Sequence, residues 1–197
     1  MVQQKSPQLA VNVIAGAPGT GKSTIAKILQ PKLNTALLEF GRMPEFQDRG
    51  DGNNIGYVEE QGIAFENLVL VAKNYIKCGF KNIILTDLED ERIYRIPKLF
   101  EKTNYITFTL TMADNNGLKA RVLASDMSSH YRDYKSAVAI NSSILAREQV
   151  PNEIRINKIT NLEDPNTYIE FLEPIDENPA YKVKINGKLD AELDCGG

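Results

Sequence analysis

The stretch Gly-Ala-Pro-Gly-Thr-Gly-Lys-Ser occupies residues 16–23 and is a complete G-x-x-x-x-G-K-S phosphate-binding loop. The glycines of such a loop allow a tight backbone turn, so that successive N–H groups point at the β-phosphate of a nucleotide. Lys22 is then expected to reach the β- and γ-phosphates, and the hydroxyl of Ser23 to coordinate Mg²⁺. The stretch therefore predicts a nucleoside triphosphate site, provided that a strand precedes it and a helix follows.

The flanking residues meet that condition. Residues 9–15 are a mostly apolar run of strand length, and residues 23–33 carry apolar side chains at helical spacing. A loop at a helix N-terminus offers unpaired N–H groups and the positive end of the helix dipole, and both favour a triphosphate. The expected nucleotide-binding residues are Gly16, Ala17, Pro18, Gly19, Thr20, Gly21, Lys22, Ser23, Thr24 and, from a later helix, Arg121.

The composition excludes several other classes of protein. The 197 residues are 42% hydrophobic and 25% charged, which is ordinary for one globular α/β domain. The formal net charge of -3 gives no general attraction to nucleic acid or to an anionic membrane, and no apolar run approaches the roughly 20 residues that cross a bilayer. Cys78 and Cys195 suggest neither a disulfide nor a zinc site. Because the first residues lack a secretory signal, we expect a cytoplasmic protein without membrane or nucleic-acid partners.

Strand and helix patterns alternate along most of the chain. Strands are expected over residues 9–15, 35–40, 81–86, 105–112 and 152–157. Helices are expected over residues 23–33, 59–78, 90–100, 118–125, 133–148 and 165–172, and Pro97 should bend or split the third of them. The alternation predicts a three-layer α/β fold, in which helices cover both faces of a parallel five-stranded sheet and ligands bind at the C-terminal edge of its strands.

The C-terminal end has a different pattern. Residues 181–185 and 188–193 flank Asn186-Gly187, which is a good signal for a two-residue hairpin. The flanks are charged and the chain ends in Cys-Gly-Gly, so a disordered tail is an equal alternative.

Two acidic residues follow strands that should end beside the phosphate loop. Asp87 closes the apolar run Ile-Ile-Leu-Thr at residues 83–86, so Asp87 and Ser23 are the expected ligands of Mg²⁺. Glu39 lies at the end of the second strand and is expected to bind a substrate hydroxyl or to act as its base. For both residues, the alternative is a solvated charge at the end of a strand.

Four arginines are candidates for neutralising a phosphoryl group in transfer. Arg42 lies three residues after Glu39, and Arg92 closely follows the third strand, so both are expected in a substrate pocket. Arg121 and Arg132 bracket the polar residues 126–131 and could close over the phosphates, although a solvated helix face is an even alternative for each arginine. The expected catalytic residues are thus Lys22, Glu39, Asp87 and Arg132, and the expected substrate residues are Glu39, Arg42 and Arg92.

With those residues placed, the chain resembles the P-loop kinase superfamily of shikimate, gluconate and nucleoside kinases and zeta-type toxins. It is most similar to small bacterial and phage ATP-binding proteins labelled as AAA-type domains, through residues 37–46, 64–70, 78–100 and 131–133. The group often has an arginine where this chain has Ser125, and tends to have a glycine where this chain has His130.

The resemblance implies ATP as the nucleotide and transfer of its γ-phosphoryl group to a small-molecule acceptor. It leaves the acceptor and the oligomeric state open. We expect a kinase-like domain over residues 1–175, with a short lid at about 126–132, and a C-terminal extension over residues 176–197 that has no counterpart in the group.

Other classes of protein also use a phosphate-binding loop of this kind. Asp114-Asn-Asn-Gly fits the D-x-x-G of a GTPase and Asn157-Lys-Ile-Thr begins like N-K-x-D, but Thr160 replaces the aspartate that would bind guanine. An AAA+ motor is disfavoured because the remaining residues are too few for a helical lid domain. The serious alternative is a regulatory protein that binds ATP and hydrolyses it slowly, without a small-molecule acceptor.

Overall fold

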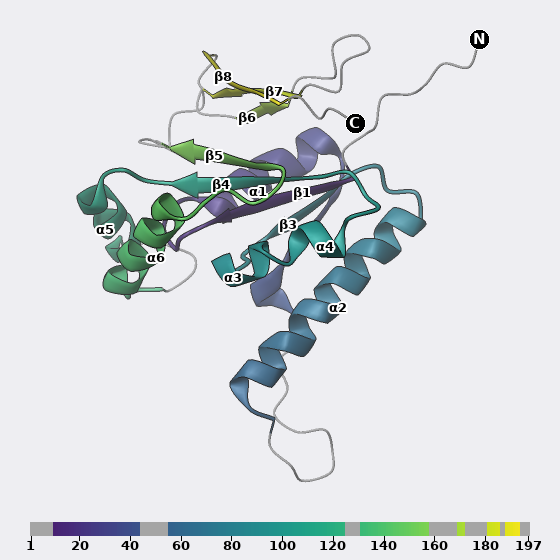
Figure 1. Ribbon diagram of the computed structural model, residues 1–197, viewed down its shortest axis with the longest axis horizontal. Coiled ribbons are helices and arrows are strands. Elements are labelled where there is room, and N and C mark those ends of the chain that lie inside the picture. The colour runs from purple at the N-terminus through teal and green to yellow at the C-terminus, as the bar shows by residue number, and fades with distance from the viewer. Residues whose placement is uncertain are drawn as a thin grey trace.

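The computed structural model describes residues 10–43, 55–124, 131–157, 169–171, 181–185 and 188–193 (Figure 1). Five strands form one sheet in the order β2-β3-β1-β4-β5, and every neighbouring pair is parallel. The strands are β1 (Val11–Gly16), β2 (Ala36–Glu39), β3 (Ile83–Thr86), β4 (Tyr105–Thr111) and β5 (Glu153–Asn157). The expected parallel five-stranded sheet is therefore confirmed.

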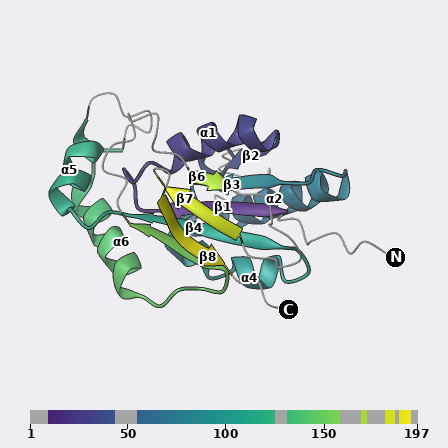
Figure 2. The ribbon, with the colours of Figure 1, turned by 90° about the horizontal axis from the view of Figure 1, so that it is seen from above.

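Helices cover both faces of this sheet, as the alternating pattern predicted (Figure 1, Figure 2). They are α1 (Lys22–Leu33), α2 (Tyr57–Lys77), α3 (Asp90–Ile93), α4 (Ile96–Leu99), α5 (Asn115–Leu123) and α6 (Tyr134–Ala146), with a 3-10 turn, η1 (Phe40–Arg42), after β2. Because side chains alternate along a strand, Val11, Val13 and Ala15 of β1 pack in the core under α2, whereas Ile14 packs in the core under α1.

Two sequence signals explain where the shorter helices begin and break. Pro97 stands in the first turn of α4, where it has no N–H to donate to the carbonyl of Ile93, so the helix expected over residues 90–100 is split into α3 and α4. The carboxylate of Asp114 accepts a hydrogen bond from the backbone N–H of Asn116 at 2.9 Å and thereby caps α5. This cap moves the start of α5 three residues ahead of the expected position.

A second sheet lies near the C-terminus and contains β6 (Ile169–Phe171), β7 (Tyr181–Ile185) and β8 (Lys188–Leu193). β7 and β8 are antiparallel and Ile185 pairs with Lys188, which is the hairpin arrangement that was one of the two alternatives for this segment. The helix expected over residues 165–172 is wrong at Ile169–Phe171, where pairing with the later strand β7 produces a strand instead. The proposed boundary between residues 175 and 176 falls between β6 and β7, and the division into domains stays a prediction.

Among the residues that the structure describes, no helix is both long enough and apolar enough to cross a membrane. Residues 126–130 of the expected lid lie outside the described residues.

Candidate functional site

The phosphate loop runs from the end of β1 at Gly16 to the start of α1 at Lys22. Gly16 and Gly19 have backbone φ angles of 135° and 82°, in the left-handed range that favours glycine. A Cβ atom on Gly16 would stand 2.8 Å from the Oγ1 atom of Thr20, and one on Gly19 would stand 2.6 Å from a methyl group of Val122 in α5. The backbone conformation of the loop therefore requires both glycines, and the close contact with α5 also requires Gly19.

Lys22 carries the positive charge of the loop. Its ammonium group donates a hydrogen bond to the backbone carbonyl of Ala17 at 3.1 Å, so the side chain curves over its own loop. Burial lowers the pKa of Lys22 below its ordinary value of 10.5, and the nearby charge of Asp87 acts in the opposite direction. Ser23 and Thr24 follow in the first turn of α1, Ser23 half-buried and Thr24 exposed.

Asp87 follows β3 and is held in an unusual conformation. Its φ angle of 66° is left-handed, which is uncommon for a residue other than glycine. Its Oδ2 atom accepts a hydrogen bond from the backbone N–H of Gly41, in η1, at 3.2 Å. Just before it, the hydroxyl of Thr86 donates to the backbone carbonyl of Ile14 at 3.1 Å and ties β3 to β1. These contacts hold the carboxylate of Asp87 between the phosphate loop and the turn after β2.

A cavity of about 600 Å³ opens beside the loop. Gly16, Pro18 and Lys22 line one side of it, and the other walls come from η1, the first turns of α2, residues 87–91, Tyr131 and α6. The wall opposite the loop is acidic, because it carries the side chains of Glu60, Glu89, Asp90 and Glu91. Within the described part of the chain, Lys22 is the only cationic side chain that lines the cavity.

Glu39 and Arg42 lie together at the end of β2. They form an ion pair in which the Arg42 side chain is 72% exposed and the Glu39 side chain only 12%. The second carboxylate oxygen of Glu39, Oε1, is buried and has no hydrogen-bond partner among the described residues. Glu39 directly precedes Phe40, which lines the cavity, whereas Arg42 extends toward solvent.

Arg92 lies behind the cavity wall instead of facing the cavity. Its guanidinium is 4.4 Å from the ring centre of Phe40, pairs with the carboxylate of Glu89 at 2.5 Å and donates to the Oε1 atom of Gln61 at 3.4 Å. Phe40, Gln61 and Glu89 all line the cavity and come from three separate segments of the chain. The buried guanidinium of Arg92 therefore holds three parts of the wall in place.

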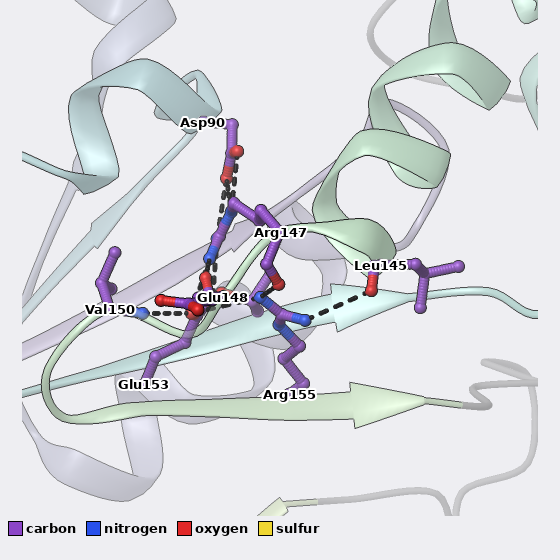
Figure 3. Close-up of polar contacts among 8 residues, drawn as sticks. Asp90, Leu145, Arg147, Glu148, Val150, Glu153 and Arg155 are labelled. Carbon is purple, nitrogen blue, oxygen red and sulfur yellow. Dashed lines mark hydrogen bonds and ion pairs between the residues drawn. The ribbon is translucent and has the colours of Figure 1, made fainter.

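A second, half-buried arginine, Arg147, lies between Asp90 and Glu153, as Figure 3 shows. The Nε atom of Arg147 donates to both carboxylate oxygens of Asp90 at 3.1 and 2.8 Å, and its Nη atoms donate to Glu153 at 2.8 and 2.7 Å. Burial alone would raise the pKa of Glu153, but hydrogen bonds from Arg147, Thr109 and the backbone of Val150 outweigh it and lower the pKa. The network joins the end of α6 to α3 and fixes Asp90 at the wall.

The remaining two expected arginines lie on the α5 and α6 side. Arg121 of α5 has its Nη1 atom 3.6 Å from the sulfur of Met112, and burial lowers the pKa of Arg121. Arg132 is exposed and donates to the backbone carbonyl of its neighbour Tyr131 at 2.9 Å. Tyr131 lines the cavity, so Arg132 stands next to the cavity but does not line it.

Comparisons of this sequence with protein families and with curated proteins find no match.

Comparisons with solved structures find proteins of similar fold. A sugar kinase from Janibacter sp. HTCC2649 aligns with a TM-score of 0.52 at 16% identity, over 80% of this chain and 87% of that one. A gluconokinase from Sinorhizobium meliloti 1021 aligns with a TM-score of 0.51 at 11% identity, over 79% and 86% of the two chains. An APS kinase from Mycobacterium tuberculosis, in complex with AMPPNP and APS, aligns with a TM-score of 0.50 at 16% identity, over 80% and 93%.

At such low identities the likeness concerns the fold alone. The sheet order, the layers of helices and the phosphate loop between β1 and α1 agree with it. The chain has the three-layer α/β fold of the P-loop kinases.

Proposed function

We propose that this protein is a kinase that binds ATP at the phosphate loop and transfers its γ-phosphoryl group to a small molecule in the adjoining cavity. The cavity is the observation that carries the proposal. Its volume of about 600 Å³ extends from Lys22 and Gly16 to walls built from η1, α2 and α3, and so leaves room for a second ligand beside the phosphates. A regulatory ATPase without an acceptor would have no need of this space.

The residues around the loop suit ATP with Mg²⁺. Lys22 would contact the β- and γ-phosphates, and the hydroxyl of Ser23 and the carboxylate of Asp87 would hold the ion. In the described ranges, no group of three or more His, Cys, Asp or Glu side chains could hold a metal by itself. Mg²⁺ needs no such group here, because phosphate oxygens and waters usually complete its shell. The complex of the APS kinase with AMPPNP supports nucleotide binding by this fold.

The transfer requires an acceptor hydroxyl held beside the γ-phosphate and a group that accepts the proton of that hydroxyl. The acceptor oxygen forms a bond to the γ-phosphorus, the bond from that phosphorus to the bridging oxygen of ADP breaks, and the hydroxyl proton leaves to a carboxylate. We assign that carboxylate to Glu39, since its buried Oε1 atom lacks a partner and such an atom is stabilised by a donor such as a hydroxyl. Lys22 and Arg132 would stabilise the charge of the phosphoryl group, and Mg²⁺ would supply further positive charge when bound.

The charges of the wall narrow the choice of acceptor. Arg92 and Arg147 do not line the cavity, whereas their acidic partners Glu89 and Asp90 do. We therefore place Arg92 among the residues that position the wall, and we keep Arg42 as a substrate contact only through its ion pair with Glu39. The excess of acidic over basic residues on the cavity wall favours an acceptor that is uncharged or cationic over one that carries a carboxylate or phosphate.

The experiment is a screen for a phosphorylated product. Wild-type protein and the Lys22→Ala variant are incubated with ATP, Mg²⁺ and panels of neutral, amine-bearing and acidic hydroxyl metabolites, and the products are detected by phosphorus NMR and mass spectrometry. The proposal expects a product with wild type alone, from the neutral or amine-bearing panel, and its loss in Glu39→Gln. ATP binding with the same trace hydrolysis across every panel would instead identify the regulatory alternative.

A further inference from the structure

A groove lined by lysines lies between α2 and α4, far from the phosphate loop. Its volume is about 440 Å³, and Lys73 and Lys77 of α2 face Lys98 and Lys102 across it. Lys73 is nine residues beyond Ala64, which lines the cavity beside the phosphate loop on the same helix, and at about 1.5 Å per residue this is a separation of about 14 Å. Figure 1 shows α4 beside the C-terminal half of α2. The groove is therefore separate from the candidate nucleotide site.

No described residue neutralises the four lysines by an ion pair. Within the described part of the chain, Lys73 has a contact with an aromatic ring, its ammonium lying 5.8 Å from the ring centre of Phe100, and the other three have neither a hydrogen bond nor a ring contact. Among the described residues, Glu101 is the one acidic residue on the groove wall. Like charges one turn apart on a helix repel each other, so Lys73 and Lys77 disfavour the fold when the groove holds no anion.

Helix dipoles explain only part of this arrangement. Lys77 lies in the last turn of α2 and Lys98 in that of α4, where a cation stabilises the negative end of the helix. Lys73 precedes the last turn of α2, and Lys102 lies beyond the end of α4. The convergence of these two further lysines on the same groove needs another explanation.

We infer that this lysine groove binds a small anion that carries phosphate groups. Lysine ammonium groups bind phosphate as point charges, and the side chains of Ile76 and Leu99 on the groove wall can contact the carbon skeleton of a metabolite. The volume lies within the range of about 300–1,000 Å³ that is typical of small-molecule sites.

The charge of the whole chain favours a small ligand over a polymer. At physiological salt a charge is screened beyond about 8 Å, so a small anion interacts mainly with the charges of the groove wall, which are the four lysines and Glu101. A nucleic acid or an anionic membrane would also approach the rest of a protein whose formal net charge is -3. The local excess of lysine therefore attracts a short oligophosphate or phosphorylated metabolite more effectively than it attracts a long polyanion.

Calorimetric titration of the full chain with inorganic tripolyphosphate tests this inference. The titration uses the Lys22→Ala background, in which the phosphate loop contributes little. The groove variant adds Lys73→Gln and Lys98→Gln, one from each side of the groove, and the control variant adds Lys27→Gln and Lys135→Gln, which are exposed lysines elsewhere. Thermal melting shows that each variant is folded.

We expect the groove substitutions to weaken tripolyphosphate binding by about tenfold or more, and the control to change it by less than about threefold, with binding that weakens as salt is added. Equal binding by the groove variant, or an equal loss in the control, would overturn the inference. Parallel titrations with single-stranded oligonucleotides and with phosphatidylserine vesicles address the alternatives. Tighter, lysine-dependent binding of either one would overturn the assignment to a small anion.

Discussion

The carboxylate of Asp87 and the backbone N–H of Gly41 join the ends of two neighbouring strands through a hydrogen bond of 3.2 Å. A Cβ atom at position 41 would stand 2.6 Å from the Oδ2 atom of Asp87, so the approach is possible only with glycine. Since Asp87 itself has a left-handed φ angle of 66°, this contact helps to hold it in a conformation that few aspartates adopt.

Gly41→Ala is expected to displace the Asp87 carboxylate. Hydrogen bonds to charged groups contribute about 1.5–3 kcal/mol, so the loss should lower turnover by roughly tenfold to a hundredfold, at about 1.4 kcal/mol per factor of ten. It should also raise the Mg²⁺ concentration needed for half-maximal rate. Steady-state kinetics over a range of Mg²⁺ concentrations measure both effects.

Gly62→Ala is the matched control for that substitution. Gly62 lies inside α2, and a Cβ atom there meets nothing within 4 Å. Alanine in place of a helical glycine should stabilise the protein by about 0.5–1 kcal/mol, with unchanged kinetics. Similar losses of turnover in the two variants would show that Asp87 is not positioned through Gly41.

Arg92 and Arg42 offer a second matched comparison, because each pairs with a glutamate three residues before it. The Arg92 side chain is only 7% exposed, and its removal leaves Glu89 and Gln61 without their guanidinium partner. We expect Arg92→Met to lower the free energy of unfolding by about 2 kcal/mol or more, and Arg42→Met to lower it by less than about 1 kcal/mol. Urea denaturation followed by circular dichroism measures both values, and equal losses would contradict the assignment of Arg92 to the wall.

The sheet and the phosphate loop could be predicted because their signals are local. The strand 9–15, the loop and the helix after it are contiguous in sequence, and the apolar run that ends at Asp87 marks a strand without reference to any partner. The split at Pro97 follows from one residue's missing N–H.

Other features depend on contacts between residues far apart in sequence. Arg147 bonds to Asp90 across 57 positions, and no local pattern distinguishes it from other arginines near helix ends. The direction in which Arg92 points depends on the rings of Phe40 in η1 and Phe65 in α2, which lie far from it in sequence. The strand Ile169–Phe171 could not be predicted locally, because its partner β7 begins ten residues later in the sequence.

The lowered pKa of Lys22 gives the ligand-free protein a pH dependence. Burial disfavours the ammonium form in the folded state, so below the ordinary pKa of 10.5 the unfolded chain binds more protons than the folded one. Stability should therefore rise with pH in the alkaline window between the folded-state pKa and 10.5. Urea denaturation at several alkaline pH values should show this rise in wild type, relative to Lys22→Met, and identical pH profiles would contradict the burial of the charge.

Arg132 is expected to act on the transfer step more than on nucleotide affinity. It is exposed beside the cavity-lining Tyr131, so its contact with phosphate should form as charge develops in transfer. Once an acceptor is known, Arg132→Ala should lower turnover by about tenfold or more and change ATP affinity by less than about threefold. Lys135→Ala, an exposed cation nearby on α6, is the control. Weaker ATP binding with an unchanged rate at saturation would make Arg132 an ordinary binding contact.

The most direct test of the central claim is a calorimetric titration of the wild type and of Lys22→Ala with ATP and Mg²⁺. We expect the wild type to bind one ATP, and Lys22→Ala to bind it at least about a hundredfold more weakly, since the ammonium contacts both the β- and γ-phosphates. Thermal melting should show that the variant remains folded, because substitution of Lys22 removes no apolar core residue. Equal ATP affinity in the two proteins would contradict the account.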